Sequence, residues 1–223
     1  DTGGYTISDN AAAVAGANSA SELGDADSVT VTGVATAAQG ATINGFDDAT
    51  TNTITFNVED SATDLAANAG SLGLADSVSV VGSVDNDITV SEAQALQGIA
   101  GYAGQSGGYT ISDDAAAVAG ATSTHLGNAD SVTVTGAADA TQGVTINGLD
   151  AVTTNIPFNV VDNGSGLNTV LSADGDISRA NTVSLNPSFT SYDAAHAAGL
   201  SLDITSDLAG SLAPTKAAFA ELV

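Results

Sequence analysis

The chain has 223 residues, of which 26 are acidic and only two, Arg179 and Lys216, are Arg or Lys, so its formal net charge is −24. This charge excludes nucleic acid as a partner, because phosphate groups are bound through Lys and Arg, and it disfavours docking on anionic lipid. The absence of Cys excludes disulfides and thiolate metal sites.

No apolar run reaches the roughly 20 residues that a membrane-spanning helix needs, so we expect no membrane insertion. The chain opens without a basic-then-apolar signal segment, which leaves Asp1 as a mature N-terminus or as a point inside a longer protein. Hydrophobic content is 43%, mostly Ala and Val. Such small side chains suit thin, closely packed layers better than a thick globular core.

The sequence repeats itself at an offset that falls from 104 to 102 residues. GGYTISDNAAAVAG at 3–16 returns as GGYTISDDAAAVAG at 107–120, and QGATINGF at 39–46 returns as QGVTINGL at 142–149. Self-similarity at a fixed period is typical of repeat architectures. We therefore expect one repeat unit over residues 1–104, a second over 105–185, and a divergent segment over 186–223 that caps the stack or contacts the next subunit.

A finer period lies within these units. The pattern Ala-[Asp/Asn]-[Ser/Thr]-Val begins at Ala26, Ala75, Ala129 and Ala180, with spacings of 49, 54 and 51 residues. Between these positions come other strand-like runs, at Tyr5–Ile7, Ile54–Val58, Ile88–Val90, Tyr109–Ile111 and Ile156–Val160. The step from strand to strand is thus about two dozen residues, which is the length of one solenoid coil.

Each coil is expected to contain a strand and a short helix. Alternation in Val29-Thr30-Val31-Thr32 predicts a strand with Val on the core side. Helix starts are expected after Ser8, Ser91, Ser112 and Asp60 or Ser61, and stops at Gly16, Gly70, Gly98 and Gly120. The divergent segment is expected to be helical at Asp193–Gly199 and Pro214–Val223.

The alternation of strands and helices favours parallel strands joined by crossovers. We therefore predict an α/β repeat, a parallel β/α solenoid with coils of about 24 residues. The alternative is two β-rich modules in tandem.

A column of polar residues stands at the second position of the Ala-[Asp/Asn]-[Ser/Thr]-Val pattern, formed by Asp27, Asp76, Asp130 and Asn181. These residues are either a row of calcium ligands or a ladder of turn residues that bond neighbouring backbone amides. Asn181 favours the ladder, because Asn keeps the hydrogen-bond acceptor but lacks the charge.

Calcium is the one cofactor for which the sequence offers candidates. Closely spaced acids in a tight loop supply three or four of the six to eight oxygens that Ca²⁺ needs, and Gly175 permits the bend in one of three such runs. The runs give seven candidate ligands: Asp25, Asp27, Asp85, Asp87, Asp174, Asp176 and Ser178. None of the runs completes an EF-hand or the glycine-rich nonapeptide of calcium-binding β-rolls.

Catalysis has little support in the sequence. There is no glycine-rich phosphate loop followed by Lys and no Gly-x-Ser-x-Gly elbow. A hydrolase that uses paired carboxylates is the remote alternative, with thin support in a chain that lacks Trp. We expect a protein that is not an enzyme, in which Arg179 forms a surface pair with a neighbouring acid.

Runs such as Tyr5-Thr-Ile-Ser-Asp-Asn-Ala-Ala-Ala-Val and Ala129-Asp-Ser-Val-Thr-Val-Thr-Gly resemble the tandem Ala/Thr/Asp-rich repeats of very large bacterial and cyanobacterial surface proteins, of adhesin or surface-layer type. The resemblance covers about residues 3–185. It implies a microbial extracellular or cell-surface location, frequent calcium dependence and no catalysis, and it assigns no catalytic residues.

The sequence therefore predicts a non-catalytic, extracellular structural protein whose repeat units stack or polymerise into a filament, surface layer or adhesin stalk. Exposed strand edges would let copies of the chain associate with one another. The alternative is a calcium-dependent binding module for a surface glycan or protein.

Overall fold

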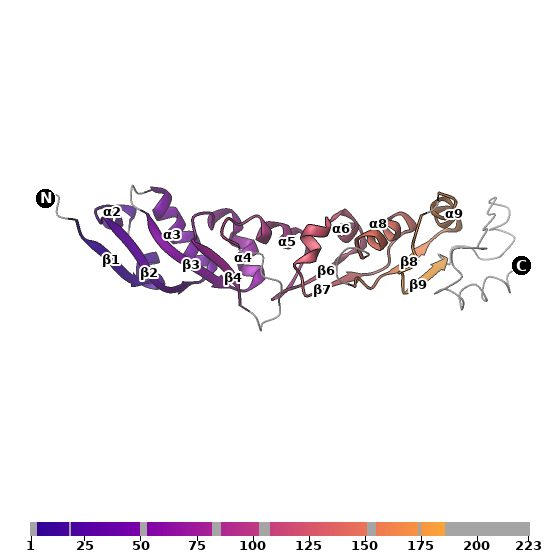
Figure 1. Ribbon diagram of the computed structural model, residues 1–223, viewed down its shortest axis with the longest axis horizontal. Helices are drawn as coiled ribbons and strands as arrows, with labels where there is room; N and C mark the ends of the chain where they lie inside the picture. Colours follow the sequence, from indigo (N-terminus) through magenta and orange to yellow (C-terminus); the bar gives the residue numbers. More distant parts are fainter. Residues whose placement is uncertain are drawn as a thin grey trace, which may run out of the picture. The chain divides into compact units, whose positions relative to one another are not determined.

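The computed structural model describes residues 4–17, 19–49, 53–81, 86–102, 108–150, 155–173 and 175–185. In these residues, strands and helices alternate along the chain (Figure 1). The strands are β1 (Thr6–Asn10), β2 (Ser28–Ala35), β3 (Ile54–Asp60), β4 (Ser77–Val80), β5 (Asp87–Ile88), β6 (Thr110–Asp114), β7 (Ser131–Thr135), β8 (Asn159–Asp162) and β9 (Thr182–Leu185). The helices are α1 (Ala11–Ala15), α2 (Ala20–Gly24), α3 (Ala37–Ala49), α4 (Ala62–Asn68), the 3-10 turn η1 (Ala69–Ser71), α5 (Val90–Gln97), α6 (Ala115–Gly120), α7 (Ser123–Gly127), α8 (Ala140–Asp150) and α9 (Gly164–Ser172).

The strands form parallel sheets in which spatial order follows chain order. One sheet has the order β1-β2-β3-β4, a second β5-β6-β7 and a third β8-β9. Neighbouring strands pair in parallel, for example with Ile7 opposite Val29 and Val58 opposite Val78. The predicted mixed α/β fold with parallel strands is therefore confirmed, and the helices between the strands set it apart from the alternative of two β-rich modules.

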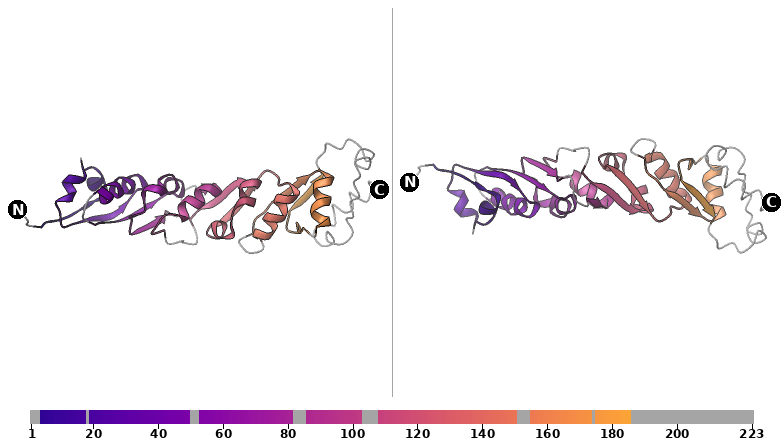
Figure 2. Two further views of the ribbon diagram at one scale, coloured as in Figure 1. Left: turned by 90° about the horizontal axis from the view of Figure 1, so that it is seen from above. Right: turned by 90° about the horizontal axis from the view of Figure 1, so that it is seen from below.

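The chain divides into two compact units, one formed by residues up to Ile111 with Asn128–Asp130, the other by Ser112–Gly127 with residues from Ser131 onward. In the first unit, α3 and α4 cover one face of the β1–β4 sheet (Figure 2). Strand β3 shows the resulting division, because Ile54, Phe56 and Val58 are each 1% exposed while the residues between them are exposed. This is the alternation that the sequence predicted.

Two strand predictions were too long. The predicted strand Ile88–Val90 is reduced to β5, because Thr89 leaves the strand to cap α5. The predicted strand Ile156–Val160 begins only at Asn159 in β8. Two of the glycines expected to stop helices, Gly16 and Gly98, directly follow α1 and α5. Gly120 is instead the last residue of α6, and Gly70 lies in η1.

The predicted helix starts were right at Ser61 and wrong elsewhere. The Ser61 side chain accepts a hydrogen bond from the Asp64 amide at 3.1 Å. Ser8 and Ser112 lie inside β1 and β6, and the caps are the strands' last residues, Asn10 and Asp114. In place of Ser91, Thr89 caps α5 in a reciprocal box with Glu92.

The two longest helices, α3 and α8, were not predicted. Their sequences contain Gly, Thr and Ile, which lower helix propensity, and they form because they pack closely on the sheet. A Cβ atom at Gly40 would lie 2.6 Å from Val58 Cγ2, and one at Gly143 would lie 2.7 Å from Val160 Cγ2. The repeated Gln-Gly pair therefore marks a close approach of helix and strand.

Among the described residues, no helix combines the length and apolar character needed to cross a bilayer. The helices expected at Asp193–Gly199 and Pro214–Val223 lie outside the described residues.

Candidate functional site

The polar column of the sequence joins neighbouring strands through the main chain. Each of its members donates its amide to the carbonyl oxygen of an aromatic residue in or just before the preceding strand. These bonds are 2.8–2.9 Å long and run from Asp27 to Tyr5, from Asp76 to Phe56, from Asp130 to Tyr109 and from Asn181 to Phe158.

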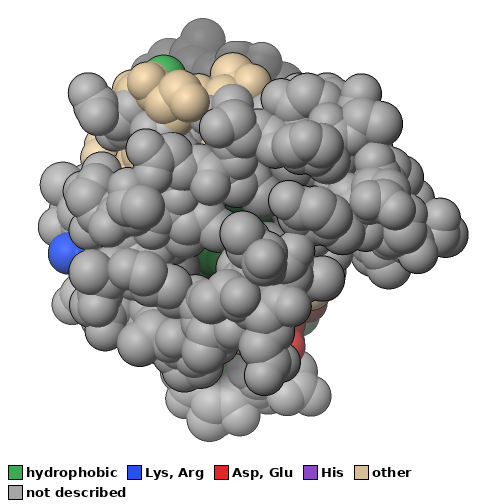
Figure 3. Space-filling view, turned by 90° about the vertical axis from the view of Figure 1, so that its right-hand side faces the viewer, with side chains coloured by type: hydrophobic (Ala, Val, Ile, Leu, Met, Phe, Trp, Pro, Cys, Tyr) green, Lys and Arg blue, Asp and Glu red, His purple; other side chains and the backbone are tan. Residues whose placement is uncertain are grey.

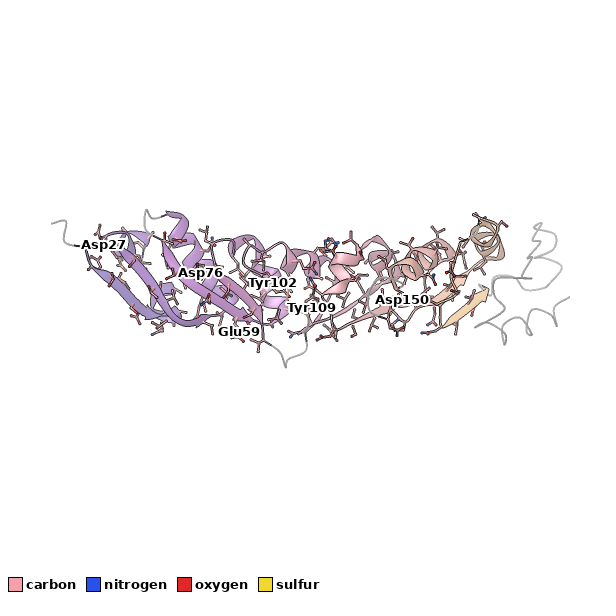
Figure 4. The ribbon with its side chains drawn as sticks, viewed as in Figure 1. Asp27, Glu59, Asp76, Tyr102, Tyr109 and Asp150 are labelled. Atoms are coloured by element: carbon pink, nitrogen blue, oxygen red, sulfur yellow. The ribbon has the colours of Figure 1, made fainter. Side chains whose placement is uncertain are left out.

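Two carboxylates of this column also accept a neighbouring amide, as the ladder interpretation predicted. Asp76 Oδ2 accepts from the Phe56 amide at 2.9 Å, and Asp130 Oδ2 accepts from the Gly108 amide at 2.8 Å. The Asp27 carboxylate lies against Gly4, where an added Cβ would be 1.6 Å from Oδ2. Asp27 and Asp76 are shown in Figure 4. The ladder role is confirmed for Asp76 and Asp130.

A second row of polar side chains caps helices that precede them in the chain. Asp60 Oδ2 accepts from the amide of the first residue of α3 at 2.9 Å, and Asp162 Oδ2 does the same for α8 at 3.0 Å. Asn86 Oδ1 accepts from the first amide of α4 at 3.0 Å. A helix has free amides in its first turn, and these three side chains each satisfy one such amide of the helix that precedes them in the chain. We call Asp60, Asn86 and Asp162 the capping row.

The capping row was not predicted, although the repeat contained a signal for it. Asp60 and Asp162 are the last residues of β3 and β8. Each uses Oδ1 to accept the amide of the residue that follows, at 2.9 and 2.6 Å. Paired positions at the ends of repeated strands are therefore candidates for such caps.

Helices α3 and α8 carry a third set of equivalent contacts. Asn44 Oδ1 accepts from the Leu74 amide, and Asn147 Oδ1 from the Arg179 amide, both at 2.8 Å. One turn further on, Asp47 and Asp150 accept from the amides that open the next strand region, at Ile54 and Ile156. The Thr-Ile-Asn-Gly motif of both repeats thus fixes the chain that follows each helix.

Arg179 forms an ion pair that differs from the predicted surface pair. Its Nη1 atom lies 3.0 Å from Asp150 Oδ2, and the two side chains are 49% and 4% exposed. Arg179 is the one Lys or Arg among the described residues, and cationic atoms are visible at the surface in Figure 3. The prediction was wrong about the acid, which is buried because it also holds the Ile156 amide.

Two tyrosines lie close together near the start of β6 (Figure 4). The Tyr109 hydroxyl accepts from Gln97 Nε2 at 3.1 Å. The Tyr102 hydroxyl oxygen is buried and has no hydrogen bond among the described residues. Burial raises the pKa of both phenols, that of Tyr102 to about 12. These phenols are therefore held in the neutral form.

The predicted calcium ligands fall at separate places. Asp25, Asp27, Asp87, Asp176 and Ser178 are exposed, and Asp85 and Asp174 lie outside the described residues. The Ser178 amide donates to Asp176 Oδ1 at 2.8 Å, and this bond lowers the pKa of Asp176. Asp87 accepts from the Thr110 hydroxyl. Among the described residues, no three acidic or His side chains form a group arranged for a metal ion.

Strand β1 stands at the end of its sheet. It pairs with β2 from Thr6 to Asn10, and the strand order places no other described strand beside it. Its second edge therefore presents main-chain donors and acceptors in the geometry that a further parallel strand would use.

The described chain is thus a repetitive α/β protein with parallel sheets, in which polar rows connect successive strand–helix segments. Comparisons with known protein families, with curated proteins and with solved structures found no match for it.

Proposed function

We propose that this chain is a non-catalytic structural protein of a microbial cell surface or extracellular layer, in which solenoid-like coils stack and copies of the chain assemble edge to edge. The observation that carries the proposal is the repetition of one set of contacts along the chain, in which Asp76 and Asp130 accept main-chain amides of the preceding strand region and Asp60 and Asp162 cap the preceding helices. A parallel strand added at the β1 edge would extend the same pattern.

The net charge supports an extracellular location and determines the ionic conditions in which assembly should be measured. At −24 per chain, copies repel one another at low ionic strength, and this repulsion is screened by salt within about 10 Å at 0.1 M. Divalent cations would screen or bridge the carboxylates more strongly, as the sequence hypothesis of calcium dependence requires. Assembly is therefore to be measured in calcium, in magnesium and with chelator.

The test is light scattering after size-exclusion chromatography, combined with negative-stain microscopy of the purified chain over a range of concentrations. We expect oligomers that grow with concentration and appear as filaments or lattices. A strictly monodisperse monomer at the highest concentration, in all three ionic conditions, would contradict the proposal.

A pair of variants at one position connects assembly to the β1 edge. The Thr110 amide, at the position that Thr6 holds in the first repeat, donates to Asn86 O at 2.9 Å, so the Thr6 amide is expected to face the open edge. Thr6→Pro removes this donor at the first residue of a strand, where Pro is tolerated. Thr6→Val keeps the amide. We expect Thr6→Pro to reduce assembly and Thr6→Val to preserve it. Equal assembly of the two variants would show that assembly does not depend on the β1 edge.

A further inference from the structure

The face of the strands that the helices do not cover is open to solvent in both units. In the first unit, α3 and α4 lie on one face of the sheet (Figure 2), and on the other face Thr30 and Asn57 are exposed. The equivalent side chains of the second unit, Thr133 and Asn159, are exposed as well. Parallel sheets are usually covered on both faces, so an open face of this kind is available to a partner. We call it the outer face.

The outer face is almost uncharged, although the chain has a net charge of −24. Among the described residues of β2–β4, the exposed side chains are those of Thr, Val, Asn and Ser, with Glu59 as the one acid. Those of β7–β9 belong to Ser, Thr, Asn and Val. The net charge repels a polyanion, and a cation would find at most one carboxylate here. An uncharged partner therefore fits this face.

Each unit holds one Asn amide on the outer face in a defined orientation. The Ser77 hydroxyl donates to Asn57 Oδ1 at 2.7 Å, and the Thr182 hydroxyl donates to Asn159 Oδ1 at 2.8 Å. In both pairs the two residues lie opposite each other in neighbouring parallel strands. The occupied Oδ1 atom fixes which way the amide points, and each Nδ2 group carries two N–H donors. The described residues provide no acceptor for these donors, so they can bind a ligand.

The surroundings of Asn57 suit a sugar ring. The Thr55 hydroxyl lies 3.4 Å from the Thr30 hydroxyl, and both are exposed. Val34, which is 55% exposed, lies opposite Asn57 in the preceding strand. A sugar ring has hydroxyl groups around its rim, each of which donates and accepts hydrogen bonds, and C–H groups on its faces. The amide, the hydroxyls and Val34 offer a contact for each of these parts.

The size and composition of the outer face favour such a ligand over a second protein. With strands about 4.8 Å apart and about 3.3 Å per residue, three strands of five residues cover roughly 250 Å². A stable protein–protein interface covers about 800 Å² on each partner, and its core is enriched in aromatic residues, Met and Arg. The exposed side chains of β2–β4 include none of these types.

We propose that the outer face of each unit binds an uncharged polysaccharide, with Asn57 and Asn159 donating their side-chain amides to sugar hydroxyls. The binding uses no metal ion. It is a second activity beside the assembly of copies, and it does not depend on that assembly.

The test is native gel electrophoresis in gels that contain a soluble polysaccharide, because an acidic chain migrates well in such gels and is retarded when it binds. The uncharged probes are hydroxyethyl cellulose, galactomannan and dextran, and the anionic counterpart is carboxymethyl cellulose. Mobility is compared with that in a gel without polysaccharide, and all gels contain chelator. We expect retardation by at least one uncharged probe and none by carboxymethyl cellulose.

Two pairs of substitutions assign the binding to the outer face. Asn57→Ala/Asn159→Ala removes the amide donors without a change of charge, and we expect the apparent affinity to fall about tenfold. Asn57→Asp/Asn159→Asp, which keeps the acceptor for the neighbouring hydroxyls, is expected to lose binding as well.

The matched control is Thr42→Ala/Thr145→Ala, at equivalent exposed positions of α3 and α8. Both hydroxyls bond only to a carbonyl oxygen of their own helix. We expect this variant to be retarded as strongly as the parent chain.

The outcomes separate this inference from the proposed assembly. The inference is overturned if no uncharged probe retards the chain, if carboxymethyl cellulose retards it equally, or if the Asn57→Ala/Asn159→Ala variant binds like the parent. If that variant instead loses assembly in light scattering while no polysaccharide binds, the outer face contacts a second copy and the inference is wrong. Retardation of a chain that remains monomeric supports the inference and contradicts the assembly.

Discussion

Helix α3 of the first repeat and helix α8 of the second have equivalent surroundings and differ in one polar contact. Both are capped by an Asp of the following strand, both approach the sheet through a Gly, and both hold the chain that follows through an Asn and an Asp. In the first repeat, however, the position that contacts the Asn is Leu74, which is 44% exposed, whereas in the second it is Arg179, which pairs with Asp150. The comparison teaches that the main-chain contacts define the fold, and the ion pair is added to them in one repeat.

The largest effect is expected at the buried acid. Asp150→Ala removes the acceptor of the Ile156 amide, and a buried amide left without its acceptor costs about 1–3 kcal/mol. The lost contact with the half-exposed Arg179 adds about 1 kcal/mol or less, so we expect a loss of about 3 kcal/mol in the free energy of unfolding.

The matched variant is Asp47→Ala in the first repeat, where the carboxylate accepts the Ile54 amide at 2.7 Å. Loss of a hydrogen bond of this kind costs about 1 kcal/mol. Urea unfolding of both variants is the measurement. Equal losses would show that the ion pair contributes nothing to the role of Asp150.

Close packing of the helix on the sheet is expected to produce the second largest effect. In Gly143→Ala the new Cβ would lie 2.7 Å from Val160 Cγ2 and 3.4 Å from Ile177 Cγ2, and overpacking of this kind costs about 1–3 kcal/mol. Gly148 lies on the same helix with no atom within 4 Å of an added Cβ.

Gly148→Ala is therefore the control, and we expect it to stabilise the protein by up to about 1 kcal/mol through helix propensity. Thermal unfolding of the two variants checks both signs. Destabilisation by Gly148→Ala as large as by Gly143→Ala would contradict the role of helix–sheet contact.

The buried phenol of Tyr102 is expected to make the stability of the protein depend on pH in alkaline solution. Burial raises the pKa of Tyr102 from 10.0 to about 12, so the folded protein binds a proton that the unfolded chain has already released. The contribution is fully present below pH 10 and is lost as the pH rises from 10 to about 12. We expect the free energy of unfolding to fall in this window.

Tyr102→Phe removes a buried hydroxyl that has no hydrogen bond among the described residues. The variant should keep its stability at pH 7 and show a smaller loss between pH 10 and 12, measured by urea unfolding at each pH. The control is Tyr5→Phe, which removes an exposed phenol of the first repeat. An identical loss in Tyr102→Phe and the parent would contradict the assignment.

The smallest effect is expected when the second repeat is made like the first. Arg179→Leu places Leu beside Asn147, as Leu74 stands beside Asn44, and keeps the main-chain bond at 2.8 Å. The lost pair has one half-exposed partner, and such pairs contribute about 1 kcal/mol or less. Combined with Asp150→Ala, the Arg179→Leu change should cost nothing more, which a double-mutant cycle would measure.

Several local features could be read from the sequence because they depend on neighbours along the chain. Alternation at Val29–Thr32 and Ile54–Val58 located β2 and β3, and a Ser before an Ala-rich segment located the cap of α4. The caps of α1 and α6 were placed too early, because the strand residues before them continue pairing with a neighbouring strand through Asn10 and Asp114.

The polar rows could be identified only from the structure, because their hydrogen-bond partners are 20 or more residues apart in the chain, as for Asp76 with Phe56 and Asp60 with Ala37. The buried state of Asp150 likewise follows from the helix that carries it, which was not predicted. A search for Asp and Asn at equal positions of both repeats would have found Asp47 and Asp150 as a pair.

The sequence by itself determined the repeat, the parallel alternation of strands and helices, and the acidic surface, because these follow from periodicity and composition. Only the tertiary structure decided which segments without strong propensity became the longest helices and which carboxylates hold main-chain amides. The physical reason is that α3 and α8 are stabilised by contact with the sheet through Gly40 and Gly143, and such contacts exist only after segments distant in the chain have come together.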